Sequence, residues 1–251
     1  MREAEGIIER VRRVSATVQR LDVAVDKSHH AVGAGQLFLV RTTASLDPYL
    51  REPWTPVRID GPYLVMERPA GQVYTPGQVI RLIGPVGKPI PLRESIRTLL
   101  LIAYEATPAS LLLLAETALA KGLAVTLALV GAALHYPLEA LPQELEVIRA
   151  DDEGQWSDQP DTLRWADQIV AVAPPPFDMS YYGKLLQSVR QARIEIPAQH
   201  VFGLFQPAMP CGIGACQACL VRSEGEEKPA CVEGPAFDLL TLNELSQESG
   251  R

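Results

Sequence analysis

The four cysteines of this chain lie close together near its C-terminal end, in the stretch CGIGACQACLVRSEGEEKPAC at 211–231. They are Cys211, Cys216, Cys219 and Cys231, separated by four, two and eleven residues. No cysteine lies elsewhere in the 251 residues, so all cysteine chemistry is confined to this segment. The loop that carries the first three thiols must fold tightly, and the fourth thiol must return to it.

The order C-x4-C-x2-C followed by a more distant cysteine is the spacing that plant-type ferredoxins use to hold a 2Fe-2S cluster. Three thiolates on one loop and a fourth from a following hairpin can surround a compact cluster. Gly212 and Gly214 lie in the first gap, where a loop that wraps a cluster needs positive φ and brings backbone N–H groups close to sulfur. The spacing therefore predicts that the four cysteines are ligands of a 2Fe-2S cluster, a one-electron carrier.

Zinc and disulfides remain as alternative uses of the four thiols. Structural zinc sites usually combine two short C-x2-C pairs, and only Cys216 and Cys219 have that spacing. Disulfides would suit a secreted protein, but the N-terminal sequence MREAEGIIERVRRV has no apolar stretch of the signal-peptide type. Four cysteines are also few for a scaffold of this length that depends on disulfides.

The composition favours a globular protein whose partner is another protein. Hydrophobic residues make up 47% of the chain, which is enough for sizeable cores. The longest apolar runs are interrupted by Glu105, Pro108 and Glu116, so none reaches the roughly 20 residues that a membrane-spanning helix needs. A net charge of −7 argues against nucleic acid or an anionic membrane as partner. Reduced cysteines without a signal peptide point to the cytoplasm.

The hydrophobic pattern changes near residue 98. Before it, short runs rich in Val, Ile, Leu and Thr predict a small antiparallel β-barrel. These runs lie at 14–25, 36–42, 57–66 and 78–83. After it, continuous apolar runs alternate with helical patterns, as in an α/β domain with a parallel sheet. The strands are expected at 98–103, 124–130 and 168–173, and the helices at 107–121 and 178–192.

A barrel, an α/β domain and a C-terminal cysteine loop in this order resemble the electron-transfer subunit of the two-subunit dihydroorotate dehydrogenases, a branch of the ferredoxin reductase superfamily. The resemblance is strongest at 209–240, which contains MPCGIGAC and CVEGPAFD. It implies that the chain is a non-catalytic electron-transfer component, with the cluster passing electrons between an FAD and the flavin of a catalytic partner subunit. The implied domains are an FAD-binding-domain-like β-barrel at 1–95, a Rossmann-like α/β nucleotide-binding-domain-like unit at 96–198 and a 2Fe-2S-binding loop and hairpin at 199–251.

The residues depart from the family pattern where FAD would bind. The family has an Arg-Pro-x-Ser tetrad, and this chain has EPWT at 52–55, so Glu52 replaces the arginine that would pair with the pyrophosphate. A glycine-rich segment of the family is represented only by ERPAGQ at 67–72. Arg51, Trp54 and Thr55 are the residues that would contact FAD, although Trp54 would equally fill the space of the flavin ring. The sequence leaves FAD binding open and favours an empty or weakly filled barrel.

The residues depart further where NAD(P)H would bind. A glycine-rich phosphate loop of the family is replaced by AYEATP at 103–108. In it, Glu105 places a negative charge at the helix N-terminus and Pro108 lacks an N–H donor. A second family segment, Cys-Gly-Pro-x-x-Met, reads APPPFDM at 173–179, where three prolines remove donors. The sequence therefore argues against NAD(P)H binding.

Three functions remain compatible with these patterns. The favoured one is a 2Fe-2S electron-transfer subunit with eroded dinucleotide sites inside a larger oxidoreductase complex. The first alternative is a complete FAD/2Fe-2S reductase subunit that accepts electrons from NADH. The second is a non-redox interaction subunit whose C-terminus is stapled by a metal. No motif for a catalytic nucleophile is present, and we expect His29 and His30 at the surface and His135 and His200 in structural roles.

Overall fold

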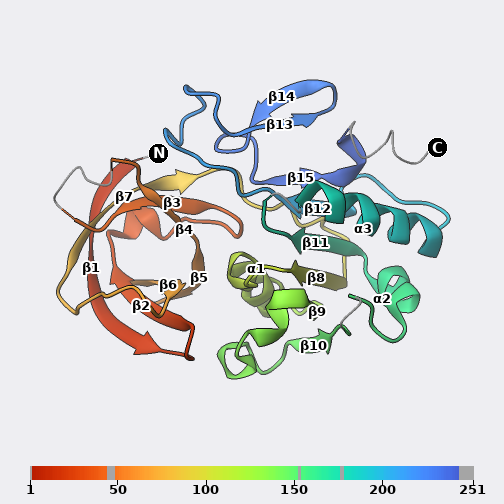
Figure 1. Ribbon diagram of the computed structural model, residues 1–251, viewed down its shortest axis with the longest axis horizontal. Coiled ribbons are helices and arrows are strands. Elements are labelled where there is room, and N and C mark those ends of the chain that lie inside the picture. Colours follow the sequence, from red (N-terminus) through yellow and green to blue (C-terminus); the bar gives the residue numbers. More distant parts are fainter. Residues whose placement is uncertain (1, 44–48, 152–153, 176–177, 243–251) are drawn as a thin grey trace.

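The computed structural model describes residues 2–43, 49–151, 154–175 and 178–242. Two sheets dominate it and lie at opposite ends of the long axis, with the C-terminal segment packed across both (Figure 1). The predicted fold class, an antiparallel barrel followed by an α/β domain and a C-terminal loop and hairpin, is confirmed. The domain boundaries at 95 and 198 stay a prediction. Within the described residues, no helix has the length and apolar character needed to span a membrane.

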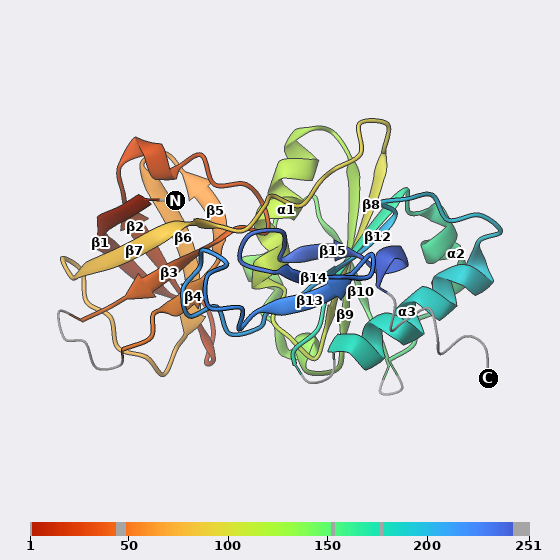
Figure 2. The same ribbon diagram turned by 90° about the horizontal axis from the view of Figure 1, so that it is seen from above.

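The N-terminal sheet has seven strands in the order β4-β3-β7-β1-β2-β6-β5, all paired antiparallel. The strands are β1 (Arg2–Arg13), β2 (Val18–Ala24), β3 (Leu37–Arg41), β4 (Glu52–Trp54), β5 (Pro56–Asp60), β6 (Tyr63–Pro69) and β7 (Val79–Val86). The strands at the two ends of this order, β4 and β5, are joined through Thr55 alone, so the sheet closes into a barrel (Figure 2). Its interior is filled by apolar side chains, including Phe38, Trp54, Leu64, Met66, Ile80 and Leu82.

The second sheet has the order β10-β9-β8-β11-β12-β15, with five parallel strands and an antiparallel edge strand. The strands are β8 (Thr98–Tyr104), β9 (Ala124–Val130), β10 (Glu146–Arg149), β11 (Gln168–Val172), β12 (Val201–Leu204) and β15 (Ala236–Asp238). In β8, Leu99 and Leu101 share a core with α1 (Ala109–Ala120). Leu100 and Ile102 share the other core with α2 (Gln159–Trp165) and α3 (Asp178–Ala192). The continuous apolar run of β8 is thus explained by helices on both faces.

Four short 3₁₀ turns and one hairpin complete the described chain. The 3₁₀ turns are η1 (Lys27–His29), η2 (Gly131–His135), η3 (Leu138–Ala140) and η4 (Leu239–Thr241), and the hairpin strands are β13 (Leu220–Ser223) and β14 (Glu226–Pro229). The run predicted at 57–66 is a hairpin, because Gly61 has a φ of 55° and reverses the chain between β5 and β6. The helix predicted from residue 107 begins at Ala109, where the Thr107 hydroxyl accepts the Ala109 N–H.

The expected surface position of His29 is wrong. The His29 side chain packs against Phe38 with ring centroids 6.2 Å apart, and the residue is only 4% exposed. His30 is half-buried rather than exposed. The turn at Lys27–His29 folds over the barrel end, which a sequence of two histidines after Lys27 does not reveal. His200 is buried, and its Nδ1 lies 2.7 Å from the carbonyl oxygen of Asp167, as a structural histidine would.

Candidate iron-sulfur site

The cysteine loop follows β12 and leads into hairpin β13–β14, which returns the chain to the loop. Pairing of Leu220 with Pro229 sets Cys219 and Cys231 at the open end of the hairpin. The Ala230 N–H donates to the carbonyl oxygen of Cys219 at 2.7 Å, which holds the two chain segments together at this end. The β13–β14 hairpin therefore returns the fourth cysteine to the loop, as predicted.

The four thiols interact with one another and differ in burial. Cys211 contacts Cys216, Cys219 contacts Cys231, and the thiol of Cys211 acts electrostatically on that of Cys231. Cys219 and Cys231 are buried, Cys211 is half-buried and Cys216 is exposed. None of the four forms a disulfide. The site therefore has a buried side formed by the hairpin and an open side formed by the loop.

The backbone of the loop directs N–H groups at sulfur. Gly212 and Gly214 have φ values of 67° and 76°, as the sequence predicted for a loop of this kind. The Gly214 N–H donates to the Sγ of Cys231 at 3.2 Å. A side chain at Gly214 would strain this conformation and would bring its Cβ within 3.0 Å of Val232. Glycine at this position thus allows the loop to approach the fourth cysteine.

The pKa values of Cys211 and Cys231 are shifted in opposite directions. Hydrogen bonds from the backbone N–H groups of Ile213 and Cys216 lower the pKa of Cys211 to about 6. Burial raises the pKa of Cys231 to about 12, and the neighbouring Cys219 thiol adds to this shift. The loop side of the site therefore favours a thiolate, while the hairpin side favours a neutral thiol unless a cation compensates the charge.

The donor set fits an iron-sulfur cluster. Four free thiols come from one loop and one hairpin, and backbone N–H groups bond two of the sulfurs, as ligands of such a cluster require. Among the described residues, no group of three or more His, Cys, Asp or Glu side chains has the spacing that holds a single metal ion. The four cysteines are the residues that would hold the cluster.

The barrel anchors the cysteine segment through the chain that leaves β7. The Gly87 N–H donates to the carbonyl oxygen of Cys231 at 3.0 Å, and Lys88 forms an ion pair with Glu233. Gly87 has a φ of 85°, and a Cβ there would lie 2.6 Å from the carbonyl oxygen of Gly234. This close approach requires glycine, so Gly87, directly after β7, holds the cysteine segment against the barrel. Gly84, Pro85 and Val86, which the sequence suggests as a tight turn, belong to strand β7.

The position of the missing FAD arginine is occupied by an ion pair. Glu52 pairs with Arg68 of β6, whose guanidinium lies 4.7 Å from the ring centroid of Trp54. Trp54 is 1% exposed, donates from Nε1 to Glu52, and meets Tyr74 edge-on. The Glu52 charge is therefore neutralised by Arg68 at the partly exposed surface of the barrel. Sequence reasoning missed Arg68, because its pairing with Glu52 depends on the closure of the barrel.

The two other residues named for FAD lie apart from this ion pair. Arg51 donates to Glu3 at 2.7 Å and to the carbonyl oxygen of Arg81 at 3.2 Å. This agrees with the alternation of side chains along a strand, which directs Arg51 and Glu52 to opposite faces. Thr55 is half-buried at the junction of β4 and β5.

The loop after β8, where a dinucleotide phosphate would bind, is filled by its own side chains. Glu105 adopts a φ of 51°, and its carboxylate accepts the Ala132 N–H at 2.9 Å. Tyr104 stacks on Tyr181 of α3 with ring centroids 4.0 Å apart. These contacts join the carboxyl end of β8 to η2 on one side and to α3 on the other. Pro176 and Phe177 of the second family segment lie outside the described residues.

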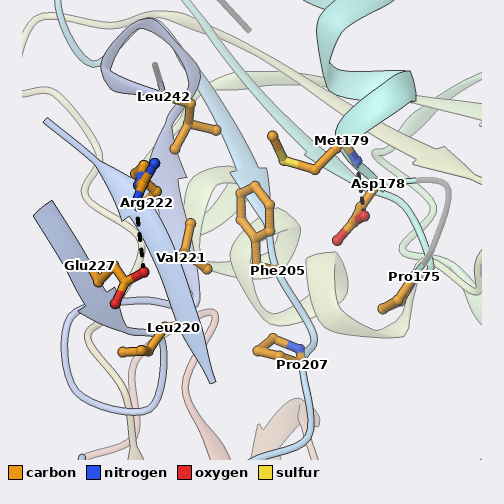
Figure 3. A pocket seen from close by; sticks show the side chains of 10 residues that line it. All are labelled: Pro175, Asp178, Met179, Phe205, Pro207, Leu220, Val221, Arg222, Glu227 and Leu242. Carbon is orange, nitrogen blue, oxygen red and sulfur yellow. Dashed lines mark hydrogen bonds and ion pairs between the residues drawn. The ribbon is translucent and has the colours of Figure 1, made fainter. Parts of the chain in front are cut away.

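A cavity of about 480 Å³ lies between the start of α3 and hairpin β13–β14 (Figure 3). It opens beyond the carboxyl ends of β11 and β12, where open α/β sheets commonly bind ligands. Its walls are mainly apolar, with Met179, Phe205 and Val221 facing one another. Arg222 supplies the cation of the described lining, and it already faces Glu227 at 3.9 Å. This lining does not provide a site for a pyrophosphate.

Comparisons with known proteins agree with the site. Residues 206–243 match the model of the iron-sulfur cluster binding domain of dihydroorotate dehydrogenase B. The chain is 25% identical to the dihydroorotate dehydrogenase B (NAD(+)) electron transfer subunit of Geobacillus sp. (strain WCH70), over 94% of this chain and 97% of that protein. It is 29% identical to the subunit of the same name from Bacillus caldolyticus, over 81% of this chain and 84% of that protein.

Solved structures share the fold. An NADH-dependent reduced ferredoxin-NADP oxidoreductase aligns with a TM-score of 0.73 and 20% identity, covering 96% of this chain and 91% of that chain. The ferredoxin reductase of carbazole 1,9a-dioxygenase, in its FAD apo form, aligns with a TM-score of 0.59 and 18% identity, covering 80% of this chain and 66% of that chain. The ferredoxin reductase fold expected from the resemblance is confirmed.

Proposed function

We propose that this chain, which is similar over nearly its whole length to electron transfer subunits of dihydroorotate dehydrogenase B, carries a 2Fe-2S cluster and transfers single electrons within a larger oxidoreductase complex. The supporting observation is the arrangement of the cysteine segment. Cys211 contacts Cys216, Cys219 contacts Cys231, and backbone N–H groups bond the sulfurs of Cys211 and Cys231. When bound, the cluster supplies a one-electron carrier. The proposed ligands are Cys211, Cys216, Cys219 and Cys231.

Two of the proposed ligands are buried and anchor the site, and a third is exposed to a partner protein. Cys219 and Cys231 are held in the core that joins the cysteine segment to the barrel and the α/β sheet. Cys216 is exposed, and Ile213 beside it is 58% exposed. This open side is where a redox partner protein would approach, because electrons pass most readily over short distances. We place this function in the cytoplasm, where cysteines stay reduced.

We propose that the barrel holds FAD weakly or not at all. FAD binding is plausible for the fold, but the arrangement of Glu52, Arg68 and Trp54 satisfies its own charges and fills the barrel wall. A pyrophosphate would have to break the Glu52–Arg68 pair to gain the guanidinium. The substrate chemistry of the complex then belongs to a partner subunit, and this chain acts as an electron carrier.

We further propose that NAD(P)H does not bind at the loop after β8. The Ala132 N–H holds the Glu105 carboxylate at this loop, where its charge would repel a phosphate, and the stacked Tyr104 and Tyr181 rings lie beside it. Calorimetric titration with NADH tests this proposal. We expect no binding in the micromolar range, because such affinity needs about 8 kcal/mol and the Glu105 carboxylate opposes the charge of the phosphates. A micromolar dissociation constant would contradict it.

The optical spectrum of the purified protein distinguishes the three candidate functions. Broad iron-sulfur absorption without flavin bands is the result expected for the proposed function. Flavin bands in addition to the iron-sulfur absorption would instead establish the complete reductase subunit. A colourless protein with one zinc ion per chain would establish the metal-stapled interaction subunit.

A further inference from the structure

A cavity of about 330 Å³ lies against the first cysteine of the loop, on the outer side of the barrel. Leu39 of β3 and Ile83 of β7 contribute apolar surface, and Cys211 contributes from the loop. The charged side chains of the described lining are two arginines, Arg41 and Arg51. The cavity is thus a cationic recess beside a proposed cluster ligand in a chain whose net charge is −7.

The two arginines differ in how their charges are satisfied. Arg51 is paired with Glu3 at 2.7 Å and bonds the carbonyl oxygen of Arg81. Arg41 donates from Nη2 to the carbonyl oxygen of Tyr49 at 3.0 Å. The Arg41 Nε is buried and has no hydrogen-bond partner among the described residues. Arg41 also forms no ion pair with any described residue. A buried donor without a partner is costly, and the Arg41 charge also lacks a carboxylate partner among the described residues.

The rim of the cavity is apolar and accessible. Tyr49 is 74% exposed and Leu50 is 53% exposed. Both residues line the recess together with the arginines. An exposed aromatic and an exposed leucine around a cationic centre are a typical combination for a protein-binding surface, where the charge sets position and the apolar rim excludes water.

We propose that this cavity receives an acidic side chain of the redox partner protein, which pairs with Arg41 and holds the partner against Cys211. The inference rests on the proposed function, since it assigns the docking contact of that same cluster site. Arg41 contributes a guanidinium that has no carboxylate partner among the described residues. Arg51, although paired with Glu3, is the second cation of the lining. The rim of Tyr49 and Leu50 packs around the incoming carboxylate. In a chain with a net charge of −7, two arginines in one recess make a local positive potential that attracts an anion.

Ferrocyanide is a suitable probe, because it is a compact anion that leaves an oxidised cluster unchanged. We expect calorimetry on the purified full-length protein to detect ferrocyanide binding at low ionic strength. Arg41→Gln should weaken it about tenfold, as expected for loss of one charge-assisted contact. Arg149→Gln on the remote strand β10 removes the same charge and should change it less than twofold. Arg41→Lys should give an intermediate value, because the charge remains without the Nε donor.

A second measurement uses electron transfer. Protein reduced with dithionite passes one electron to ferricyanide, giving ferrocyanide, or to hexaammineruthenium(III), giving the ruthenium(II) complex, and no proton or bond moves. Arg41→Gln should slow the reaction with the anionic oxidant several-fold relative to Arg149→Gln and should not slow the reaction with the cationic one. The proposal would be overturned if Arg41→Gln and Arg149→Gln changed the ferrocyanide affinity equally and also changed the rates of electron transfer to both oxidants equally.

Iron content measured on the same samples separates the two inferences. Protein without iron contradicts the proposed function, while the ferrocyanide titration still decides whether Arg41 marks an anion site. If the protein has a normal cluster, and Arg41→Gln and Arg149→Gln have the same ferrocyanide affinity and the same reaction rates, only the docking site is contradicted. If Arg41→Gln lowers the iron content, the comparison is made between Arg41→Lys and Arg149→Lys, which keep the charge.

Discussion

Cys216 is the exposed member of the cysteine set, and it lies between two other proposed ligands, Cys211 and Cys219, on the same loop. Replacing its thiol by a hydroxyl removes a ligand without adding bulk to a packed region. We expect Cys216→Ser to lose most of the iron and sulfide, because one of four cluster ligands is missing. Ser223→Ala, in the adjacent hairpin, serves as the control and should keep the normal iron content. A full cluster in Cys216→Ser would show that the ligand set is misassigned.

Glu52 and Arg68 form a charge pair at the place where a pyrophosphate-binding arginine is expected. We expect Glu52→Arg to raise FAD affinity, because it removes the carboxylate and releases Arg68 for a phosphate. Arg51→Ala should change FAD affinity little, since Arg51 bonds Glu3 and Arg81 on another face. Fluorescence titration with FAD measures both. One FAD per wild-type chain, released by Arg51→Ala, would contradict this account of the barrel.

Because of His200, we expect the folded protein to become less stable as the pH falls into the acid range. Burial lowers its pKa from 6.5 to about 4; nearby Arg193 and Arg93 also lower it, whereas the Asp167 backbone hydrogen bond and carboxylate raise it. Between these two pH values His200 is protonated in the unfolded chain and neutral in the folded chain. The free energy of unfolding therefore falls as the pH drops from 6.5 to 4. We expect a loss of roughly 1 to 3 kcal/mol in urea unfolding. His200→Gln should flatten this dependence, and an unchanged slope would contradict the assignment.

Residues recognised by a local sequence pattern could be predicted, whereas residues that meet only after folding could not. The cysteines and Gly214 could be recognised because their spacing and backbone freedom are local properties. The partners of Glu52 and Glu105 could not, because Arg68 and Ala132 approach them only after the chain folds. Arg41 carried no sequence signal at all, since its proximity to Cys211 depends on how the loop packs on the barrel.

At the scale of elements, the barrel and the α/β domain are joined by a buried hydrogen-bond network. Glu67 at the end of β6 accepts from the Tyr136 hydroxyl at 2.7 Å and from Thr107 at 3.3 Å. Arg20 of β2 pairs with Glu67 at 3.3 Å and donates to the carbonyl oxygen of Ala140 at 2.8 Å. Burial and the Glu67 carboxylate raise the pKa of Tyr136 well above its usual range. The hydroxyl therefore stays a hydrogen-bond donor at physiological pH.

This network predicts a stability effect that depends on one hydroxyl. Tyr136→Phe leaves Glu67 with one donor fewer in a buried place, and we expect it to cost about 1 to 2 kcal/mol. Urea unfolding of the purified protein measures the change. Tyr63→Phe is the matched control, because the half-buried Tyr63 ring contacts Arg10 through its face, which the change leaves in place, and it should change stability by less than about 0.5 kcal/mol. Equal effects in both variants would contradict the role of the network.

Elements with strong local patterns were predictable, and elements stabilised by distant contacts were not. The buried strand β9 and helix α3 occur at the predicted residues, because an apolar run and a helical period define them. Strand β1 was missed, since its sequence REAEGIIERVRR is highly charged and its pairing comes from β2 and β7 on either side. The hairpin of β13 and β14 was expected from the distance between Cys219 and Cys231, but its strands are only four residues each and their bounds could not be predicted.

At the scale of the whole molecule, the C-terminal segment packs against both other parts. It pairs with the α/β sheet through β15 beside β12, and it bonds the barrel through Gly87 and Cys231. Cys219, Val221 and Leu239 share one core with the α/β sheet and with Leu39 of the barrel. The order of the parts could be predicted from the change in hydrophobic pattern and from the resemblance, but this packing depends on contacts between residues far apart in the chain.

Iron and acid-labile sulfide in anaerobically purified wild-type protein test the central claim most directly. We expect about two irons and two sulfides per chain, and a one-electron paramagnetic signal after reduction with dithionite. Both quantities should fall together in Cys216→Ser. Stoichiometric zinc without iron, in protein produced with ample iron, would contradict the assignment of the four cysteines to an iron-sulfur cluster.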